Sequence, residues 1–437
     1  MDPARSSKLR AVVRVASGNF LVMYDFIVFG FYASAIGTAF FPSGNHFVSL
    51  MLALMTFGVG FLMRPLGAIV LGAYADRQGR RAGLILTSSL MSIGIVSIAC
   101  VPGYDSIGVW APLLVLGGRL LQGFSAGMEL GAVSVYLSEI ATPGRKGFYV
   151  SWQSASQQAA VMCAALLGLG LNATLSPAAM SRWGWRVPLL AGCAIIPLLH
   201  RLCGSLEETD EFLATRRHTT IPDVLRALAA NAHLVVIGTL MVTMTTVSFY
   251  MITAYTPTFG NSVLKLSSSA SLTVTLLVGL SNLLWLPIMG TLSDRIGRRP
   301  LLIACTLLML TSAYPAMQWL VDGPSFSKLL AVLLWFSFIF GSYNGAMVPF
   351  LTEIMPADFR TTGFSLAYSL AAGVFGGFTP ALSMYLIHLT GNRAIPGVWL
   401  TIAAGCGLIA ALLARPLSTA AVRYPLSAAG AARAARS

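Results

Sequence analysis

Four ionisable side chains lie within otherwise apolar stretches of the sequence, away from the ends of those stretches. They are Asp25, Arg64, Arg119 and Glu129. A charge inside a hydrophobic span is costly, so it is usually paired or functional. Carboxyl groups can carry protons, and guanidinium groups bind carboxylates through two parallel hydrogen bonds. These four residues therefore predict proton transfer together with the binding of an anion.

Asp25 and Arg119 form the most specific hypothesis for coupled chemistry. Removal of a carboxyl group from water disfavours its charged form, whereas a nearby guanidinium favours that form. If an anion draws Arg119 away, Asp25 becomes easier to protonate, which couples proton binding to anion binding. A static ion pair that only fixes two helices is the alternative. Glu129 is the second candidate for the acid that carries the proton.

Arg64 and a group of neutral polar residues are candidates for binding the same anion. Arg64 lies shortly before a charged loop, so it could anchor an anion or brace the loop. On a helical wheel of residues 109–139, Gln122 and Glu129 fall within about 20° of each other. The other candidates carry amide or hydroxyl groups that could bind carboxylates or satisfy neighbouring helices: Gln153, Ser154, Gln157, Tyr250, Asn282, Tyr343 and Asn344.

The composition places these residues in a membrane protein. Hydrophobic residues make up 56% of the chain and charged residues 10%, and the mean hydropathy is +0.76. A soluble domain carries about a quarter charged residues. At roughly 20 apolar residues per crossing, the chain holds about twelve spans. The predicted spans are residues 16–41, 47–73, 83–101, 109–139, 148–174, 186–203, 232–258, 268–292, 300–321, 328–353, 362–390 and 396–415.

The positive charges lie mainly on one side of these predicted spans. Twenty-one of the 28 Lys and Arg residues fall in segments that share a side with both ends of the chain, and five fall in the opposite loops. This asymmetry predicts that both termini lie in the cytoplasm. The net charge of +13 therefore indicates topology rather than a nucleic-acid partner.

Two loops and two helix ends occur twice in the sequence. Residues 72–81 and 290–299 share two glycines, an aspartate and three arginines in the same order, and residues 131–140 resemble residues 345–354. A duplicated half is the simplest cause. The sequence therefore predicts an all-α membrane protein of two pseudo-symmetric six-helix bundles, residues 1–203 and 231–437, joined by a cytoplasmic linker at residues 204–230. Parallel repeats place a binding site between the bundles, near mid-membrane.

The second half of the repeat lacks the buried charges of the first. Asn282 aligns with Arg64, Leu333 with Arg119 and Tyr343 with Glu129. We therefore expect proton coupling and anion attraction in the N-terminal bundle. The C-terminal bundle is expected to supply neutral polar contacts and motion.

The charged loops are predicted to form a cytoplasmic gate. Their aspartates and arginines lie level with acidic helix ends, so charge pairs could hold this side shut and break as the bundles rock. A purely topological role of the arginines is the alternative. The predicted gate residues are Asp76, Arg77, Arg80, Arg81, Glu139, Arg145, Asp294, Arg295, Arg298, Arg299, Glu353 and Arg360.

The loop pattern Gly-x-x-x-Asp-Arg-x-Gly-Arg-Arg, present twice, resembles the signature loop of the major facilitator superfamily. The stretches at residues 64–67 and 118–129 resemble its metabolite–proton symporter family, in particular the citrate- and tricarballylate-transporting members. The resemblance implies a twelve-helix carrier of the bacterial inner membrane that imports a citrate-like tricarboxylate with protons by alternating access. That family usually has a glutamate where this chain has Val22, which leaves Asp25 or Glu129 as the coupling acid.

Other classes of protein find less support in the sequence. A Gly-x-x-x-x-Gly-Lys-Ser/Thr motif for ATP binding is absent, so the proton gradient is the expected drive and no cofactor is expected. The five histidines are scattered and the six cysteines lie singly, which argues against a metal site and against an enzyme. A monomer that contacts only its carboxylate substrate, protons and lipid is expected. The alternatives are a tricarballylate or dicarboxylate symporter and, less favoured, a non-transporting membrane sensor.

Overall fold

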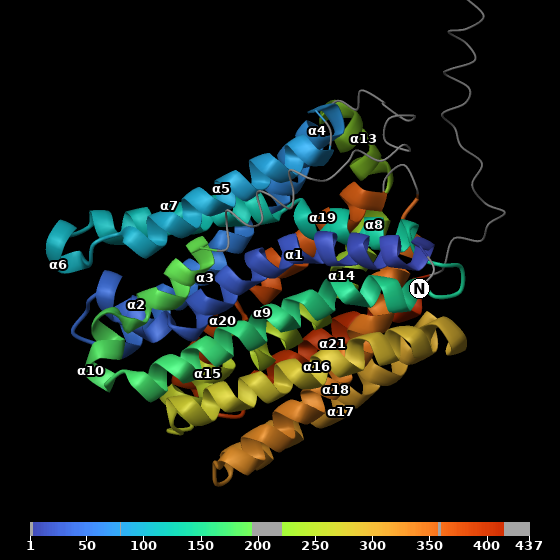
Figure 1. Cartoon of the computed structure of the whole chain (residues 1–437). Coiled ribbons are helices and arrows are strands. Elements are labelled where there is room, and N and C mark those ends of the chain that lie inside the picture. The colour runs from blue at the N-terminus through green and yellow to red at the C-terminus, as the bar shows by residue number, and fades with distance from the viewer. Residues whose placement is uncertain (1–2, 79, 195–220, 357–359, 415–437) are drawn as a thin grey trace, which may run out of the picture.

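The computed structural model describes residues 3–78, 80–194, 221–356 and 360–414, and within these ranges every regular element is a helix. The helices form an elongated bundle in which the N-terminal half lies beside the C-terminal half (Figure 1). The short elements α6 and α10 lie at one end of this bundle, and α13 and the N-terminus lie at the other (Figure 1).

The N-terminal half contains five predicted spans in full and part of a sixth. Its helices are α1 (Pro3–Phe31), α2 (Ala33–Phe40), α3 (His46–Leu62), α4 (Arg64–Gln78), α5 (Arg80–Cys100), α6 (Tyr104–Ile107), α7 (Trp110–Ala126), α8 (Glu129–Glu139), α9 (Lys146–Thr174), α10 (Pro177–Ala179), the π-helix η1 (Met180–Gly184) and the helical residues 186–194.

The C-terminal half repeats this arrangement. Its helices are α13 (Ile221–Ala230), α14 (Ala232–Ile252), α15 (Thr256–Thr258), the π-helix η2 (Phe259–Val263), α16 (Ser268–Ile296), α17 (Arg298–Val321), α18 (Phe326–Ile354), α19 (Arg360–Ala371), the π-helix η4 (Ala372–Gly376), α20 (Thr379–Thr390) and α21 (Pro396–Leu413).

Each predicted span coincides with one helix or with successive helices, the sixth only in its described residues 186–194. Eight helices in the described part of the chain are long and apolar enough to cross a membrane, or nine when the bent pair at residues 17–31 and 33–40 counts as one span. Together with the fold comparison given below, these helices show a twelve-helix membrane bundle.

The helix boundaries follow the sequence repeat. The last residues of α4 and α16, Gln78 and Ile296, lie 218 residues apart, as do the first residues of α5 and α17 and the two charged loops. A one-residue turn separates α16 from α17. In this turn Gly297 has φ of +92°, a conformation that glycine adopts without a steric penalty. The starts of α9 and α19 lie 214 residues apart, the same offset as Gly131 and Gly345. The duplicated sequence therefore folds into duplicated helices.

Short polar side chains begin several of these helices. The side-chain oxygens of Asn45, Ser267 and Ser325 accept hydrogen bonds from backbone N–H groups in the first turns of α3, α16 and α18. Such caps satisfy N–H groups that have no partner within the helix. They fix where these helices begin at the end of the bundle opposite to the charged loops.

Several predicted spans are not one regular helix in the structure, and residues 47–73 and 232–258 are divided between α3 and α4 and between α14 and α15. Residues 16–41 bend by 69° at Tyr32, between α1 and α2. Residues 109–139 are interrupted between α7 and α8, and residues 362–390 contain the π-helix η4. Glycine is frequent near these breaks, at Gly30, Gly127 and Gly373, where helix–helix packing allows local irregularity.

The predicted linker falls mostly outside the described residues. Residues 204–220 lie outside the described residues, whereas residues 221–230 form α13. The boundaries of the two bundles at residues 203 and 231 therefore stay predictions.

Candidate functional site

Asp25 and Arg119 lie in contact at the centre of the N-terminal half. Asp25 is on α1 and Arg119 is on α7; Nη1 of Arg119 lies 3.3 Å from Oδ2 of Asp25. The same nitrogen donates a hydrogen bond of 2.7 Å to Oε1 of Gln122, one turn further along α7. The arginine is 0% exposed and the aspartate 2%. This is a desolvated ion pair, and neither side chain faces lipid or bulk water.

Phenyl rings surround the guanidinium of Arg119. Its Cζ atom lies 4.2 Å from the ring centre of Phe29, 4.6 Å from that of Phe26 and 5.4 Å from that of Phe57. Aromatic rings attract a cation through their faces without forming hydrogen bonds to it. They hold the charge within the membrane while its N–H groups stay available, and Nε and Nη2 of Arg119 have no hydrogen-bond partner in the described structure.

Arg64 lies beside this pair, at the first residue of α4. Its Cζ atom is 4.2 Å from the ring centre of Phe61 and 4.7 Å from that of Phe26. Since Arg64 and Arg119 each lie less than 5 Å from the centre of the Phe26 ring, their Cζ atoms are less than 10 Å apart. Among the described residues, Nε, Nη1 and Nη2 of Arg64 make no hydrogen bond of standard geometry, and the phenol of Tyr250 is the hydrogen-bonding group that approaches them. Two buried guanidinium groups thus present unused donors next to each other.

Glu129 and two tyrosines complete the group around Arg64. The carboxylate of Glu129 interacts electrostatically with Arg64 and lies against α1, where a Cβ atom added to Gly18 would be 2.9 Å from its Oε1. Tyr250 of α14 interacts with both arginines, and Tyr368 of α19 interacts with Arg64. The two halves of the protein therefore meet here, with the charges from one half and the phenols from the other.

The break between α7 and α8 changes the predicted relation of Gln122 and Glu129. The expectation of a shared face assumed one straight helix over residues 109–139. In the structure Gln122 contacts Arg119, whereas Glu129 begins a new helix and lies near Arg64. The two acids, Asp25 and Glu129, are thus each associated with a different arginine.

The polar face of α9 connects α1 with the C-terminal half. Asn19 donates a hydrogen bond of 2.8 Å to the backbone oxygen of Gln153, and Gln157 donates one of 3.4 Å to Oδ1 of Asn19. On the other side of α9, Nδ2 of Asn344 donates to Oγ of Ser154 at 2.8 Å. These predicted residues come together near the interface between the halves.

Asn282 and Tyr343 have different surroundings from each other. Asn282 of α16 donates a hydrogen bond of 3.2 Å to Gln158 of α9 and accepts one of 2.8 Å from Ser337. The phenol of Tyr343 donates to the backbone oxygen of Met241 at 2.8 Å, within the C-terminal half. The structure therefore brings Asn282 to the interface between the halves and packs Tyr343 away from the arginines.

Asp294 links the halves at the end of the bundle that carries the charged loops. Its two carboxylate oxygens accept hydrogen bonds from the backbone N–H groups of Gly147 (2.8 Å) and Phe148 (3.2 Å), in the first turn of α9. An anion at this position also interacts favourably with the positive end of the helix dipole. Arg298 donates to Asp294 at 2.6 Å and pairs with Glu353 at 3.3 Å, so the aspartate is held in place.

The other predicted gate residues are distributed around this contact. Arg299 donates to the backbone oxygens of Ala411 and Leu412 at the end of α21. Arg145, Arg295 and Glu139 are exposed, and Arg360 is partly buried. The side chains of four predicted residues fall outside the described part of the structure: Asp76, Arg77, Arg80 and Arg81.

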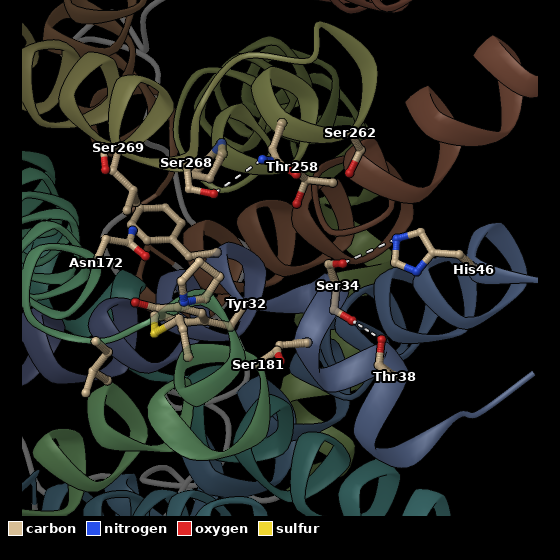
Figure 2. A pocket seen from close by; sticks show the side chains of 18 residues that line it. Tyr32, Ser34, Thr38, His46, Asn172, Ser181, Thr258, Ser262, Ser268 and Ser269 are labelled. Atoms are coloured by element: carbon tan, nitrogen blue, oxygen red, sulfur yellow. Dashed lines mark hydrogen bonds between the residues drawn. The ribbon is translucent and has the colours of Figure 1, made fainter.

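Two glycines allow the halves to touch beside Asp294. A Cβ atom on Gly147 would lie 2.2 Å from the backbone oxygen of Gly290, and one on Gly290 would lie 2.6 Å from that of Gly147. The helices α9 and α16 therefore meet backbone to backbone, and the structure is closed at this end. A cavity between the halves lies at the opposite end, lined by residues of α2, α9, η2 and α16 among others (Figure 2).

The aromatic residues of this site were not predicted from the sequence. Phe26, Phe61 and Tyr368 resemble the many other aromatic residues of the predicted spans, so residue type gives no signal. The spacing of Phe57, Phe61 and Arg64 at three and four residues, which places them on one helix face, is the signal that could have identified them. Among the described residues, no group of three or more His, Cys, Asp or Glu could hold a metal ion.

Comparisons with known proteins agree with these observations. Residues 11–224 match the family of sugar and other transporters, and residues 273–435 match the major facilitator superfamily. The chain is 60% identical to a citrate–proton symporter of Klebsiella pneumoniae, over 94% of this chain and 92% of that protein. It is 58% identical to a citrate–proton symporter of Salmonella typhi, over 93% and 94%, and 33% identical to an alpha-ketoglutarate permease of Escherichia coli, over 87% of each.

A solved structure shows the same fold at low sequence identity. The xylose transporter XylE from E. coli, in a partially occluded inward-open conformation, superposes with a TM-score of 0.75 over 93% of this chain and 97% of that chain, at 19% identity. One assignment follows from the duplicated helices, from the two charged loops and from the sequence identity to known symporters over most of the chain. This chain belongs to the major facilitator superfamily and, within it, to the metabolite–proton symporter family that includes the citrate–proton symporters.

Proposed function

We propose that this protein is a proton-coupled secondary transporter that imports citrate across the bacterial inner membrane by alternating access. The observation that carries the proposal is the pair of buried arginines, Arg64 and Arg119, whose unused N–H donors lie close together beside two buried acids. The chain is 58–60% identical to two citrate–proton symporters over more than nine-tenths of its length, which supports citrate as the substrate and the proton as the coupling ion.

The two guanidinium groups suit a substrate with more than one carboxylate. Each can hold one carboxylate through parallel hydrogen bonds. Since both pack on Phe26, the ring acts as a spacer that fixes the distance between the two bound carboxylates. The phenols of Tyr250 and Tyr368 approach from the C-terminal half and can bind the remaining polar groups of the substrate. A monocarboxylate would engage only one of the two arginines.

Asp25 is the acid that we propose couples transport to the proton gradient. A substrate carboxylate competes with Asp25 for Arg119, their shared partner. Once Arg119 turns to the substrate, a charged Asp25 would remain desolvated and unpaired, so the neutral acid is favoured there. Substrate and proton therefore bind together and leave together. Glu129, close to Arg64, is the second proton-carrying candidate.

Rocking of the halves would expose this site to each side in turn. The contact between Asp294 and the start of α9 joins the halves at the end that carries the charged loops, so it must break when that end opens. We assign this end to the cytoplasm because the excess of positive residues and both termini fall on its side. The carrier would act as a monomer, without a cofactor and without catalysing a reaction.

A tricarballylate or dicarboxylate symporter is the second candidate for the function. Citrate carries three carboxyl groups, whereas two buried arginines pack on Phe26 at the proposed site. A substrate with two charged carboxylates, or a tricarboxylate with one carboxyl protonated, would be neutralised fully by them. Competition experiments distinguish these substrates.

Uptake of labelled citrate into membrane vesicles tests the proposal. With an imposed inward proton gradient, the wild-type protein should accumulate citrate, and the uptake should fall when the gradient is collapsed. Arg64→Gln should raise KM for citrate at least about ten-fold, the value of one charge-assisted hydrogen bond. The exposed Arg393→Gln serves as the matched control and should behave as the wild type. Equal inhibition of citrate uptake by acetate and by tricarballylate would argue against the proposal. Citrate uptake that is the same with and without the proton gradient would also argue against it.

A further inference from the structure

The cavity at the outer end of the bundle has the size of a small-molecule site. Its volume is about 620 Å³, within the range of roughly 300–1,000 Å³ that is typical of ligand pockets. Its walls come from both halves, with α1, α2 and α9 on one side and α15, η2 and α16 on the other (Figure 2). A ligand here would touch both bundles before it reached the arginines.

The lining of this cavity is neutral and rich in hydrogen-bonding groups. Of its 18 lining residues, ten carry hydroxyl or amide groups, and none carries a carboxyl group. His46, at the rim, is the one titratable nitrogen base among them, and it lies 3.5 Å from the hydroxyl of Ser34. Such a surface can donate hydrogen bonds to a carboxylate without repelling it.

Two hydroxyl groups of the lining are buried and unused. Tyr32 is 9% exposed and Thr258 is 4% exposed, and neither side-chain oxygen has a hydrogen-bond partner in the described structure. A buried hydroxyl without a partner is unfavourable unless a ligand or water satisfies it. Tyr32 belongs to the N-terminal half and Thr258 to the C-terminal half, so one ligand could bind both.

Tyr32 lines this cavity and follows the helix that carries Asp25. It is seven residues after Asp25 and directly follows the last residue of α1, so it lies about 10 Å further along the axis of α1 than Asp25. A Cβ atom on Gly168 would lie 3.1 Å from the Tyr32 hydroxyl and 3.1 Å from Leu272, so the phenol is wedged between α9 and α16. The bend between α1 and α2 occurs at this residue.

We propose that this cavity is a second, outer binding site for the transported carboxylate, with Tyr32 and Thr258 as its inner donors. The anion binds here first, through neutral hydrogen bonds, before it reaches Arg119. The identity of the ligand rests on the proposed function, whereas the existence of a second site does not depend on the proton coupling.

Equilibrium binding of labelled citrate to purified protein in lipid nanodiscs tests this proposal. At millimolar citrate the wild type should bind two molecules per chain, one more weakly than the other. Arg119→Gln should retain the weaker site alone. The double variant Tyr32→Phe, Thr258→Val should lose the weaker site, and each single change should weaken it roughly five-fold, as for one ordinary hydrogen bond. Tyr385→Phe and Thr401→Val, which lie outside the cavity, are the matched controls.

The outcomes separate this proposal from the proposed function. A wild-type protein that transports citrate but binds one molecule per chain at saturation would overturn the outer site and leave the transport function intact. Retention of two sites in the double variant would overturn the role of both hydroxyls. Absence of both citrate transport and citrate binding would overturn the proposed function as well. Because the stoichiometry of the wild type is itself decisive, a failure of Arg119→Gln to fold does not affect the test.

Discussion

Arg119 in the N-terminal half and Leu333 in the C-terminal half occupy equivalent positions of the repeat, yet their surroundings are opposite in kind. Arg119 pairs with Asp25 inside a ring of phenylalanines, whereas Leu333 is part of a continuous apolar core. Arg64 and its equivalent Asn282 also differ, because Arg64 is charged and packs on phenyl rings, whereas Asn282 is neutral and hydrogen-bonded to Gln158 and Ser337. Among the described residues, every charged side chain that is fully buried belongs to the N-terminal half.

This difference shows how a duplicated membrane bundle can divide its work. A buried charge destabilises a helix bundle unless a partner compensates it, so two charged copies would double that cost. With the charges in one half, the other half is free to contact the substrate through neutral groups such as Tyr250 and to move relative to the first. The relation between the halves can be tested by matched changes at equivalent positions.

The largest effect is expected from the central arginine. Arg119→Gln leaves Asp25 buried without a cation, and loss of one partner of a buried pair costs about 3–5 kcal/mol. Uptake of citrate should fall at least about a hundred-fold. The matched change Leu333→Met conserves volume and should leave uptake within about two-fold of the wild type. Similar losses in the two variants, at equal amounts of folded protein in the membrane, would contradict the assignment of the anion site to the N-terminal half.

The glycines of the two charged loops should also differ. Gly290→Ala places a methyl group against the backbone of Gly147 in the other half, so it opposes closure of the end that carries the charged loops. Gly72 is its equivalent in the repeat, and a Cβ atom there would meet no atom within 4 Å. Uptake should fall at least about ten-fold in Gly290→Ala, from a shift toward the inward-open state, and should be unchanged in Gly72→Ala.

The accessibility of the cavity to thiol reagents measures the shift toward the inward-open state directly. A cysteine introduced at Ser262, in the outer cavity, should react more slowly with a membrane-impermeant thiol reagent in the Gly290→Ala background than in the Gly72→Ala background. Equal reaction rates would show that the glycine contact does not control closure.

The smallest effects are expected from two tyrosines of the C-terminal half. Tyr250→Phe removes a phenol next to both arginines and should raise KM for citrate about five-fold, with little change in stability. Tyr343→Phe removes the hydrogen bond from the phenol to the backbone oxygen of Met241, so it should cost about 1 kcal/mol of stability with KM unchanged. Thermal unfolding and uptake kinetics of the two variants distinguish these roles, and the reverse pattern would argue that Tyr343 binds the substrate.

The sequence predicted the repeat, the spans and the buried charges, because each of these has a strong pattern. Charges are rare in apolar runs, so Asp25 and Arg119 stand out by residue type alone. The rings around them do not stand out, since Phe26 and Phe61 are ordinary residues of a membrane span. The break at Tyr32 was missed because no proline interrupts that run. The alignment of Tyr343 with Glu129 gave no information on side-chain direction, which depends on packing against α21.

Asp25→Asn tests the central claim, that the N-terminal half couples the proton to the anion. The amide keeps the shape of the side chain and its contact with Arg119 but cannot take up and release a proton. Uptake of labelled citrate into vesicles should be compared with and without an inward proton gradient, and with exchange against citrate loaded inside. We predict that exchange persists while accumulation driven by the gradient is lost. Full accumulation driven by the gradient in Asp25→Asn, at wild-type levels of protein, would contradict the account.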